Sequence, residues 1–453
     1  MRLYRIVMTI MVSVCAAFAQ TDTADLGEVF GKADSWTLDA EAFLGDYQRF
    51  GFRFLDGKGS AMSSDKEKLR FLGQPVFEAR AYFAASSLSR IEISVYNKGD
   101  AGAKDREAFD ALADKTKSDI SGHLRDSGMT GKTTSERANY VVRRHQWVKR
   151  TPGVQLEWAY VEPHRSGGRN VEYGAEYIKV VMVPIKKGGS RMTAITGGMR
   201  ATRAKSGRTV KENVKREANG DVWIENVPMV DQGQKGYCAA ASSERVLRYY
   251  GLTIDQHQIA QLAETAAAGG TTLEGMAAAV GKVGRQFQLD KRDLISIDSG
   301  GSFERSEHAK QLDRYNAAAK KKKAAVIDWQ EFTSNHMVDM QAIWRAMDPA
   351  ILLDAKSAER QGMKQFVRHI KTYAEQGVPL LWSCLVGMYP EEPELGQPGV
   401  YGHVRLIIGY NEKSNELLYS DSWGPRHALK RLPLDQAWAM TKGLIVLKPR
   451  DVR

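Results

Sequence analysis

The sequence predicts an α+β fold in two domains, a smaller one at the N-terminus and a larger one at the C-terminus. Residues 91–95 and 154–160 alternate between apolar and polar side chains, as half-buried strands do, and residues 105–124 repeat apolar side chains at helical spacing. Farther along, a helix that begins at Cys238 and short apolar runs within residues 404–420 form a second group of elements. The composition between the two groups shifts to glycine, serine and basic residues.

The chain begins with the features of a secretory signal peptide. Arg2 and Arg5 precede a short apolar stretch, residues 6–18, and the small-residue sequence A-F-A ends at Ala19. We therefore expect residues 1–19 to be removed and the protein to be exported to the periplasm or out of the cell. No later apolar run approaches the length of a membrane helix, so no membrane span is expected.

The composition argues against nucleic-acid binding. The 453-residue chain carries a formal charge of +11, and loss of Arg2 and Arg5 leaves +9. These basic residues are spread along the chain without aromatic interleaving or a nucleic-acid motif. Attraction to anionic envelope polymers stays open, and nothing in the sequence predicts an oligomeric state.

Residues 20–190 are expected to form an N-terminal α+β domain. Its strands at 91–95, 154–160 and 177–185 predict an antiparallel sheet covered by the helix at 105–124. The apolar stripe of that helix comprises Phe109, Leu112, Ala113, Thr116, Ile120 and Leu124. The domain's histidines lack metal-ligand spacing, so its role is not predicted: His123, His145 and His164.

A basic linker is expected at residues 191–221, where glycine, lysine and arginine are frequent and hydrophobic periodicity is absent. Such a segment is a solvated connector or, alternatively, a protease-sensitive site between the domains.

The candidate chemistry lies in the C-terminal domain, residues 222–453. Gly233 and Gly236 indicate a flexible loop, and Cys238 occupies the first turn of a helix that Gly251 ends. The positive end of a helix dipole favours a thiolate, which is the nucleophilic form of cysteine. Cys238 is therefore a candidate nucleophile.

A thiolate nucleophile needs a base and a group that orients the base. His403 opens an apolar strand, residues 404–408, and Asp421 follows a second strand, residues 417–420. The polar turn between these strands predicts a hairpin that brings His403 and Asp421 together.

These residues resemble the papain-like cysteine peptidases, and most closely their bacterial C39-like branch of double-glycine-type peptidase domains, over about residues 222–448. The order Cys238, His403, Asp421 is that of the family, and the D-S-W-G at Asp421 is similar to the N-S-W-G of papain. Gln232, six residues before Cys238, matches the oxyanion-hole glutamine of the family. The resemblance implies a Cys-His-Asp triad that hydrolyses peptides or proteins through a thioacyl-enzyme intermediate.

Residues 291–376 are long for a connection and mostly helical in pattern, so we expect them to form an inserted helical cap or cleft wall. Two earlier helices are predicted by capping-box spacing, at Thr253 with Gln256 and at Thr271 with Glu274. Cys384 lies in an apolar run and is expected to be buried; a disulfide to Cys238, the alternative, would block the nucleophile.

Motifs for metal hydrolases, serine hydrolases and nucleotide enzymes are absent, so neither a metal nor another cofactor is expected. Two alternatives to peptide hydrolysis stay open. One is another acyl transfer on the same residues, as in a transglutaminase-like enzyme or an amidase. The other is a catalytically idle papain-like binding protein whose N-terminal domain recognises the partner.

Overall fold

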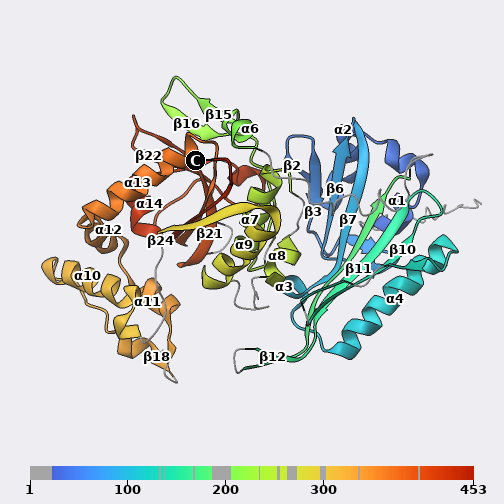
Figure 1. The fold of residues 1–453 in the computed structure, drawn as a ribbon, viewed down its shortest axis with the longest axis horizontal. Coiled ribbons are helices and arrows are strands. Elements are labelled where there is room, and N and C mark those ends of the chain that lie inside the picture. Colours follow the sequence, from blue (N-terminus) through green and yellow to red (C-terminus); the bar gives the residue numbers. More distant parts are fainter. Residues whose placement is uncertain are drawn as a thin grey trace, which may run out of the picture.

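A computed structural model describes residues 23–131, 134–137, 139–166, 169–185, 206–233, 235–252, 256–262, 273–295, 303–334, 337–395 and 398–452. Over these residues the chain has the expected α+β fold, with one antiparallel sheet in the N-terminal part and another in the C-terminal part (Figure 1). The signal peptide predicted at residues 1–19 lies outside the described residues.

The N-terminal domain is built on an antiparallel sheet with the strand order β2-β3-β6-β7-β14-β11-β10-β8, and β9 pairs with β10. The alternating runs predicted at residues 91–95 and 154–160 lie within β7 and β11, which both pair with β14. The strands are β2 (Arg53–Asp56), β3 (Ser60–Ser63), β6 (Glu78–Ala84), β7 (Ser87–Asn97), β8 (Met129–Thr130), β9 (Thr134–Arg137), β10 (Tyr140–Trp147), β11 (Gly153–Val161) and β14 (Gly174–Val183).

Helix α4 (Arg106–Leu124) covers one face of this sheet (Figure 1). The Asp105 side chain caps it by accepting a hydrogen bond from the Ala108 backbone N–H at 2.8 Å. Four of the six positions of the predicted stripe are buried, Phe109, Ala113, Thr116 and Ile120, and the other two, Leu112 and Leu124, are half-buried. Smaller elements around this core are β1 (Ala24–Asp25), α1 (Leu26–Phe30), α2 (Ala40–Tyr47), β4 (Leu69–Phe71), β5 (Gln74–Pro75), α3 (Lys98–Ala101), β12 (His164–Ser166) and β13 (Arg169–Val171).

The other face of the sheet is charged and lies against the C-terminal domain. Arg80 of β6 is paired in register with Glu92 of β7, while their neighbours Ala81 and Ile91 point to the opposite, apolar face. The Arg80 guanidinium lies 3.1 Å from Glu244 of α7, and both side chains are buried. The polar positions of the alternating strands therefore face protein at this interface.

The C-terminal domain is built on a second antiparallel sheet with the strand order β15-β16-β21-β20-β24-β17, which β22 and β23 extend beside β21. Strand β20 lies between β21 and β24 and is apolar on both faces, as a strand covered on both sides must be. The strands are β15 (Val214–Arg216), β16 (Asp221–Ile224), β17 (Leu289–Ile295), β20 (Leu380–Val386), β21 (Tyr401–Asn411), β22 (Glu416–Ser420), β23 (Lys430–Pro433) and β24 (Thr441–Pro449).

Helices surround this second sheet, and α7 and α8 lie between the two sheets (Figure 1). Helix α7 contacts β21 of the C-terminal sheet, and α8 contacts β14 of the N-terminal sheet. The helices are α6 (Gly207–Lys211), α7 (Cys238–Tyr249), α8 (Gln256–Leu262), α9 (Leu273–Phe287), α10 (Glu307–Lys321), α11 (Met340–Ala346), α12 (Pro349–Ser357), α13 (Arg360–Ala374) and α14 (Leu434–Met440); a small hairpin, β18 (Thr333–Ser334) and β19 (Met337–Val338), precedes α11.

The predicted linker, residues 191–221, differs from the structure in its second half. Residues 191–205 lie outside the described residues, but the chain from Ser206 onward forms α6 and β15, and β15 pairs with β16. The turn between these strands contains Asn219 and Gly220, and Gly220 has φ of +102°. Asn-Gly is a strong hairpin signal, which the basic composition of the segment obscured.

The predicted helical insertion, residues 291–376, contains α10 to α13. Its first residues, 291–295, instead continue β17, which pairs with β24 at the edge of the sheet. The capping residues Thr253 and Thr271 lie outside the described residues, and the helices α8 and α9 follow them.

Among the described residues, no helix combines the length and the apolar character that crossing a bilayer requires.

Candidate active site

Cys238 is the first residue of α7 and points toward β21. The N-cap residue, Tyr237, provides no side-chain hydrogen bond to the helix, so the first backbone N–H groups keep their partial positive charge beside the thiol. Burial raises the pKa of the Cys238 thiol, but the charge of His403 and a hydrogen bond to it lower the pKa more, and the net shift is downward.

The predicted hairpin is confirmed by the pairing of β21 with β22, and it places His403 next to Asp421. His403 Nε2 lies 2.7 Å from Asp421 Oδ1, and both side chains are almost fully buried. Because Nε2 is engaged by the carboxylate, Nδ1 is the ring nitrogen left for the thiol of Cys238. The three residues therefore form a connected Cys-His-Asp group.

Neighbouring charges shift the pKa values of His403 and Asp421 in the directions that keep both side chains ionised. Burial disfavours the charged imidazole, yet the neighbouring Asp421 and Cys238 raise the pKa of His403 to about 9. Burial likewise disfavours the Asp421 carboxylate, but His403 and Arg405 hold its pKa well below its usual value. The pKa of the Cys238 thiol is lowered and that of the His403 imidazole is raised, and together these shifts favour a thiolate–imidazolium pair near neutral pH.

Gln232 lies beside this group and is held at both ends of its side chain. Its Oε1 accepts a hydrogen bond from Ser422 Oγ at 2.6 Å, and its Nε2 donates to the backbone carbonyl of Lys235 at 3.2 Å. The Gln232 backbone N–H also donates to the Ser422 carbonyl at 2.8 Å. A primary amide has two N–H groups, so the second N–H of Gln232 can bind a ligand. Gln234 lies outside the described residues.

Trp423 stacks on the outer face of the His403 ring. Their ring centroids are 4.2 Å apart and the ring planes differ by 7°. This contact keeps water away from one face of the imidazole and favours its cationic form.

Arg405 is a site residue that sequence reasoning missed. Its Nε lies 2.8 Å from Asp421 Oδ2, an ion pair without the geometry of a linear hydrogen bond. Its other nitrogens form two hydrogen bonds with Glu391, at 2.9 and 2.8 Å, and Lys430 lies 3.0 Å from the same carboxylate. An arginine inside the apolar run that follows His403 was the available signal, because buried charges require partners.

A second missed arginine supports the backbone of the site. Arg245 of α7 is buried and donates to the carbonyl oxygen of Asp421 at 2.8 Å and to that of Pro228 at 2.8 Å. It thus ties the nucleophile helix to the segment that carries Asp421.

Cys384 is buried on β20 directly opposite His403 in the sheet register. Burial raises the pKa of its thiol, so it is a structural thiol, and both Cys238 and Cys384 are free cysteines. The described residues contain no cluster of histidine, cysteine, aspartate and glutamate that could hold a metal ion.

Comparison with known proteins gives the following matches. Residues 224–446 match the model of the Peptidase_C39 like family. The peptidase domain of Streptococcus ComA, a bi-functional ABC transporter involved in a quorum sensing pathway, aligns with 50% of this chain and 100% of its own, at 14% identity and a TM-score of 0.25. Xylellain, a cysteine protease from Xylella fastidiosa, aligns with 54% of this chain and 90% of its own, at 11% identity and a TM-score of 0.26. No curated protein matches the sequence.

Proposed function

Because residues 224–446 belong to the Peptidase_C39 like family and form a papain-like cysteine peptidase domain, we propose that this chain hydrolyses peptide bonds through Cys238, His403 and Asp421. The observation that carries the proposal is the 2.7 Å contact between His403 Nε2 and Asp421 Oδ1, with the pKa of the adjacent Cys238 thiol lowered and that of His403 raised. The expected substrate is a peptide or a protein.

In the acylation step, His403 Nδ1 takes the proton of the Cys238 thiol, and the thiolate sulfur forms a bond to the scissile carbonyl carbon. The carbonyl oxygen becomes an oxyanion, to which the Cys238 backbone N–H and the free N–H of Gln232 donate. When the intermediate collapses, the C–N bond breaks and the imidazolium proton passes to the leaving amine. Asp421 keeps Nε2 protonated throughout and so fixes the tautomer of the base.

In the deacylation step, a water molecule gives its proton to His403 and attacks the thioester carbonyl. The C–S bond then breaks, the carboxylic acid product leaves, and the proton returns to the thiol. An amine in place of water would give the alternative acyl transfer, so products are analysed with and without added amine.

The experiment compares Cys238→Ala with the matched control Cys384→Ala on a peptide library. Loss of turnover is expected only for Cys238→Ala, because Cys384 is a buried structural thiol whose loss affects stability alone. Labelling of the native enzyme with iodoacetamide should modify Cys238 faster than a free thiol at the same pH. Turnover that survives Cys238→Ala, or labelling no faster than a free thiol, would contradict the proposal.

We also propose that the protein is exported and that residues 1–19 are its signal peptide. The basic start, the apolar stretch and the A-F-A sequence support this proposal. N-terminal sequencing of the protein from its native source should give Gln20 as the first residue; a sequence that begins at Met1 would overturn it.

A further inference from the structure

A buried lysine in the loop before the nucleophile is bound by the N-terminal domain. The side chain of Lys235 is 1% exposed, and its Nζ lies 2.5 Å from Glu78 Oε2 on β6 and 3.1 Å from Asp100 Oδ2 on α3. A buried ammonium group is stable only when it is paired, and both of its partners come from the other domain. Two ion pairs therefore hold the loop against the N-terminal domain.

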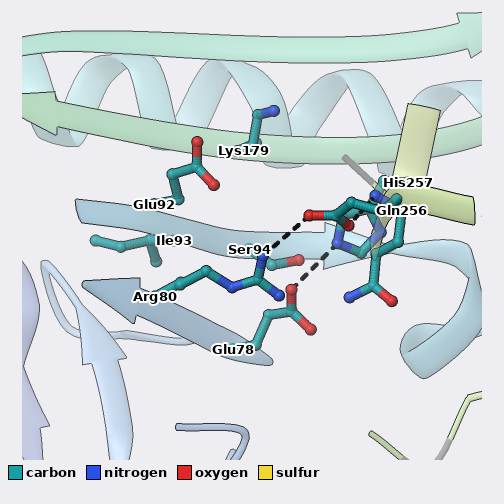
Figure 2. A pocket seen from close by; sticks show the side chains of 9 residues that line it. Glu78, Arg80, Glu92, Ile93, Ser94, Lys179, Gln256 and His257 are labelled. Carbon is teal, nitrogen blue, oxygen red and sulfur yellow. Dashed lines mark hydrogen bonds and ion pairs between the residues drawn. The ribbon is translucent and has the colours of Figure 1, made fainter. Parts of the chain in front are cut away.

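The two acidic partners are themselves held in place. The second oxygen of Glu78 lies 3.3 Å from His257 Nε2 of α8, and Figure 2 shows this contact between two of the residues that line a small cavity. Asp100 Oδ2 accepts a hydrogen bond at 2.8 Å from Asn97, which is fully buried at the end of β7. Each carboxylate thus has a fixed position before it meets Lys235.

The same domain also contacts the residue directly before the nucleophile. The Tyr237 ring packs directly against Gly99 on α3. A methyl group on Gly99 would lie 2.7 Å from Tyr237 Cε1, so the two residues are in close contact. The N-terminal domain therefore holds the loop at Lys235 and again at Tyr237, one residue before Cys238.

Lys235 connects this contact to Gln232. The backbone carbonyl of Lys235 accepts the hydrogen bond from Gln232 Nε2 at 3.2 Å, so the position of Lys235 sets the orientation of the Gln232 amide. We infer that Glu78 and Asp100 are positioning residues for the oxyanion hole, acting through Lys235, and that the N-terminal domain is part of the catalytic unit. This inference rests on the proposed peptidase function of the site.

The test uses the full-length enzyme with Lys235→Met, Glu78→Gln and Asp100→Asn. Each change should lower kcat by about tenfold to a hundredfold with little change in KM, since removing an oxyanion donor outright costs on the order of a hundredfold or more. Alkylation of Cys238 by iodoacetamide forms no oxyanion and should keep its native rate. Affinity for a peptide aldehyde, whose adduct places an oxygen in the oxyanion hole, should fall in parallel with kcat.

The matched control is Tyr82→Phe. The Tyr82 hydroxyl accepts a hydrogen bond from Arg248 of α7 at 2.8 Å across the same interface, and its other hydrogen bonds among the described residues are with Arg80 and Glu92, outside the loop. This variant should keep native kcat even where thermal unfolding shows a loss of stability. Asp100 is the most accessible member of the cluster, so Asp100→Asn gives a folded variant if Lys235→Met does not fold.

The outcomes separate the positioning role of Glu78 and Asp100 from the proposed peptidase function. Native kcat in folded Asp100→Asn and Glu78→Gln, or equal losses of kcat and of alkylation rate, would overturn the positioning role while leaving the peptidase proposal intact. Activity that survives Cys238→Ala would instead reject the proposed function itself.

Discussion

Replacing Asp421 with asparagine tests the electrostatics of the site most directly. Asp421 lies between His403 Nε2, at 2.7 Å, and Arg405 Nε, at 2.8 Å. Although burial lowers the pKa of His403, the charges of Asp421 and Cys238 raise it to about 9, compared with an ordinary value of 6.5. This difference corresponds to about 3 kcal/mol in favour of the imidazolium.

In Asp421→Asn, the amide oxygen can still accept the hydrogen bond from Nε2, so the ring keeps its orientation and part of the activity remains. The negative charge is lost, however, and Arg405 then faces a neutral group close to the imidazolium. We expect the pKa of His403 to fall and the alkaline limb of kcat/KM to move from near pH 9 toward neutral. The net rise of the His403 pKa from 6.5 to about 9 corresponds to a few hundredfold in the stability of the imidazolium, which sets the order of magnitude of the loss of activity due to charge.

The assay follows peptide hydrolysis and iodoacetamide alkylation of Cys238 as functions of pH. The matched control is Asp435→Asn, an exposed aspartate at the start of α14 with no contact to the site, and its pH profile should equal that of the native enzyme. An Asp421→Asn profile with the native alkaline limb would show that Asp421 does not set the pKa of His403, and the electrostatic argument would fail.

Three further predictions follow from the same contacts. The folded pKa of His403 is raised, so its contribution to stability should be complete below pH 6.5 and lost as the pH rises through about 9, as thermal unfolding across that interval would reveal. Gln232→Ala should slow acylation on the order of a hundredfold and spare alkylation by iodoacetamide, and a larger loss in Gln234→Ala would refute the assignment. Limited trypsin digestion should cut between Arg200 and Lys205, in the part of the predicted linker that precedes α6, and the two products should co-elute on gel filtration because buried ion pairs join the domains; separate elution would contradict this.

The parts of the site that the sequence predicted are those set by local structure. A glycine-bounded helix that starts at Cys238, and a hairpin with His403 at its start and Asp421 just past its end, follow from short-range spacing and turn residues. Their approach to each other was inferred from family order, since nothing local places a helix against a strand so far along the chain.

The supporting charges were not predictable in the same way. Lys235 and Glu78 are 157 positions apart, and a charged residue on the polar side of an alternating strand is normally expected to face water. Arg405 and Glu391 are only 14 positions apart, but Glu391 lies in a loop whose path the sequence does not define. The β15–β16 hairpin, by contrast, had a readable Asn-Gly turn, but the basic residues around it favoured a linker that continues to residue 221, whereas α6 and β15 occupy the second half of that segment.

The strand order of the C-terminal sheet has a consequence for the order in which the chain can fold. Every strand of the N-terminal sheet lies before residue 184, so that sheet can form before the C-terminal strands are present. Strand β20 is flanked by β21, which carries His403, and by β24, which lies about forty positions farther along the chain. The sheet beneath His403 is therefore incomplete until residues 441–449 have joined it. A chain that stops before residue 441 has no complete support for this site.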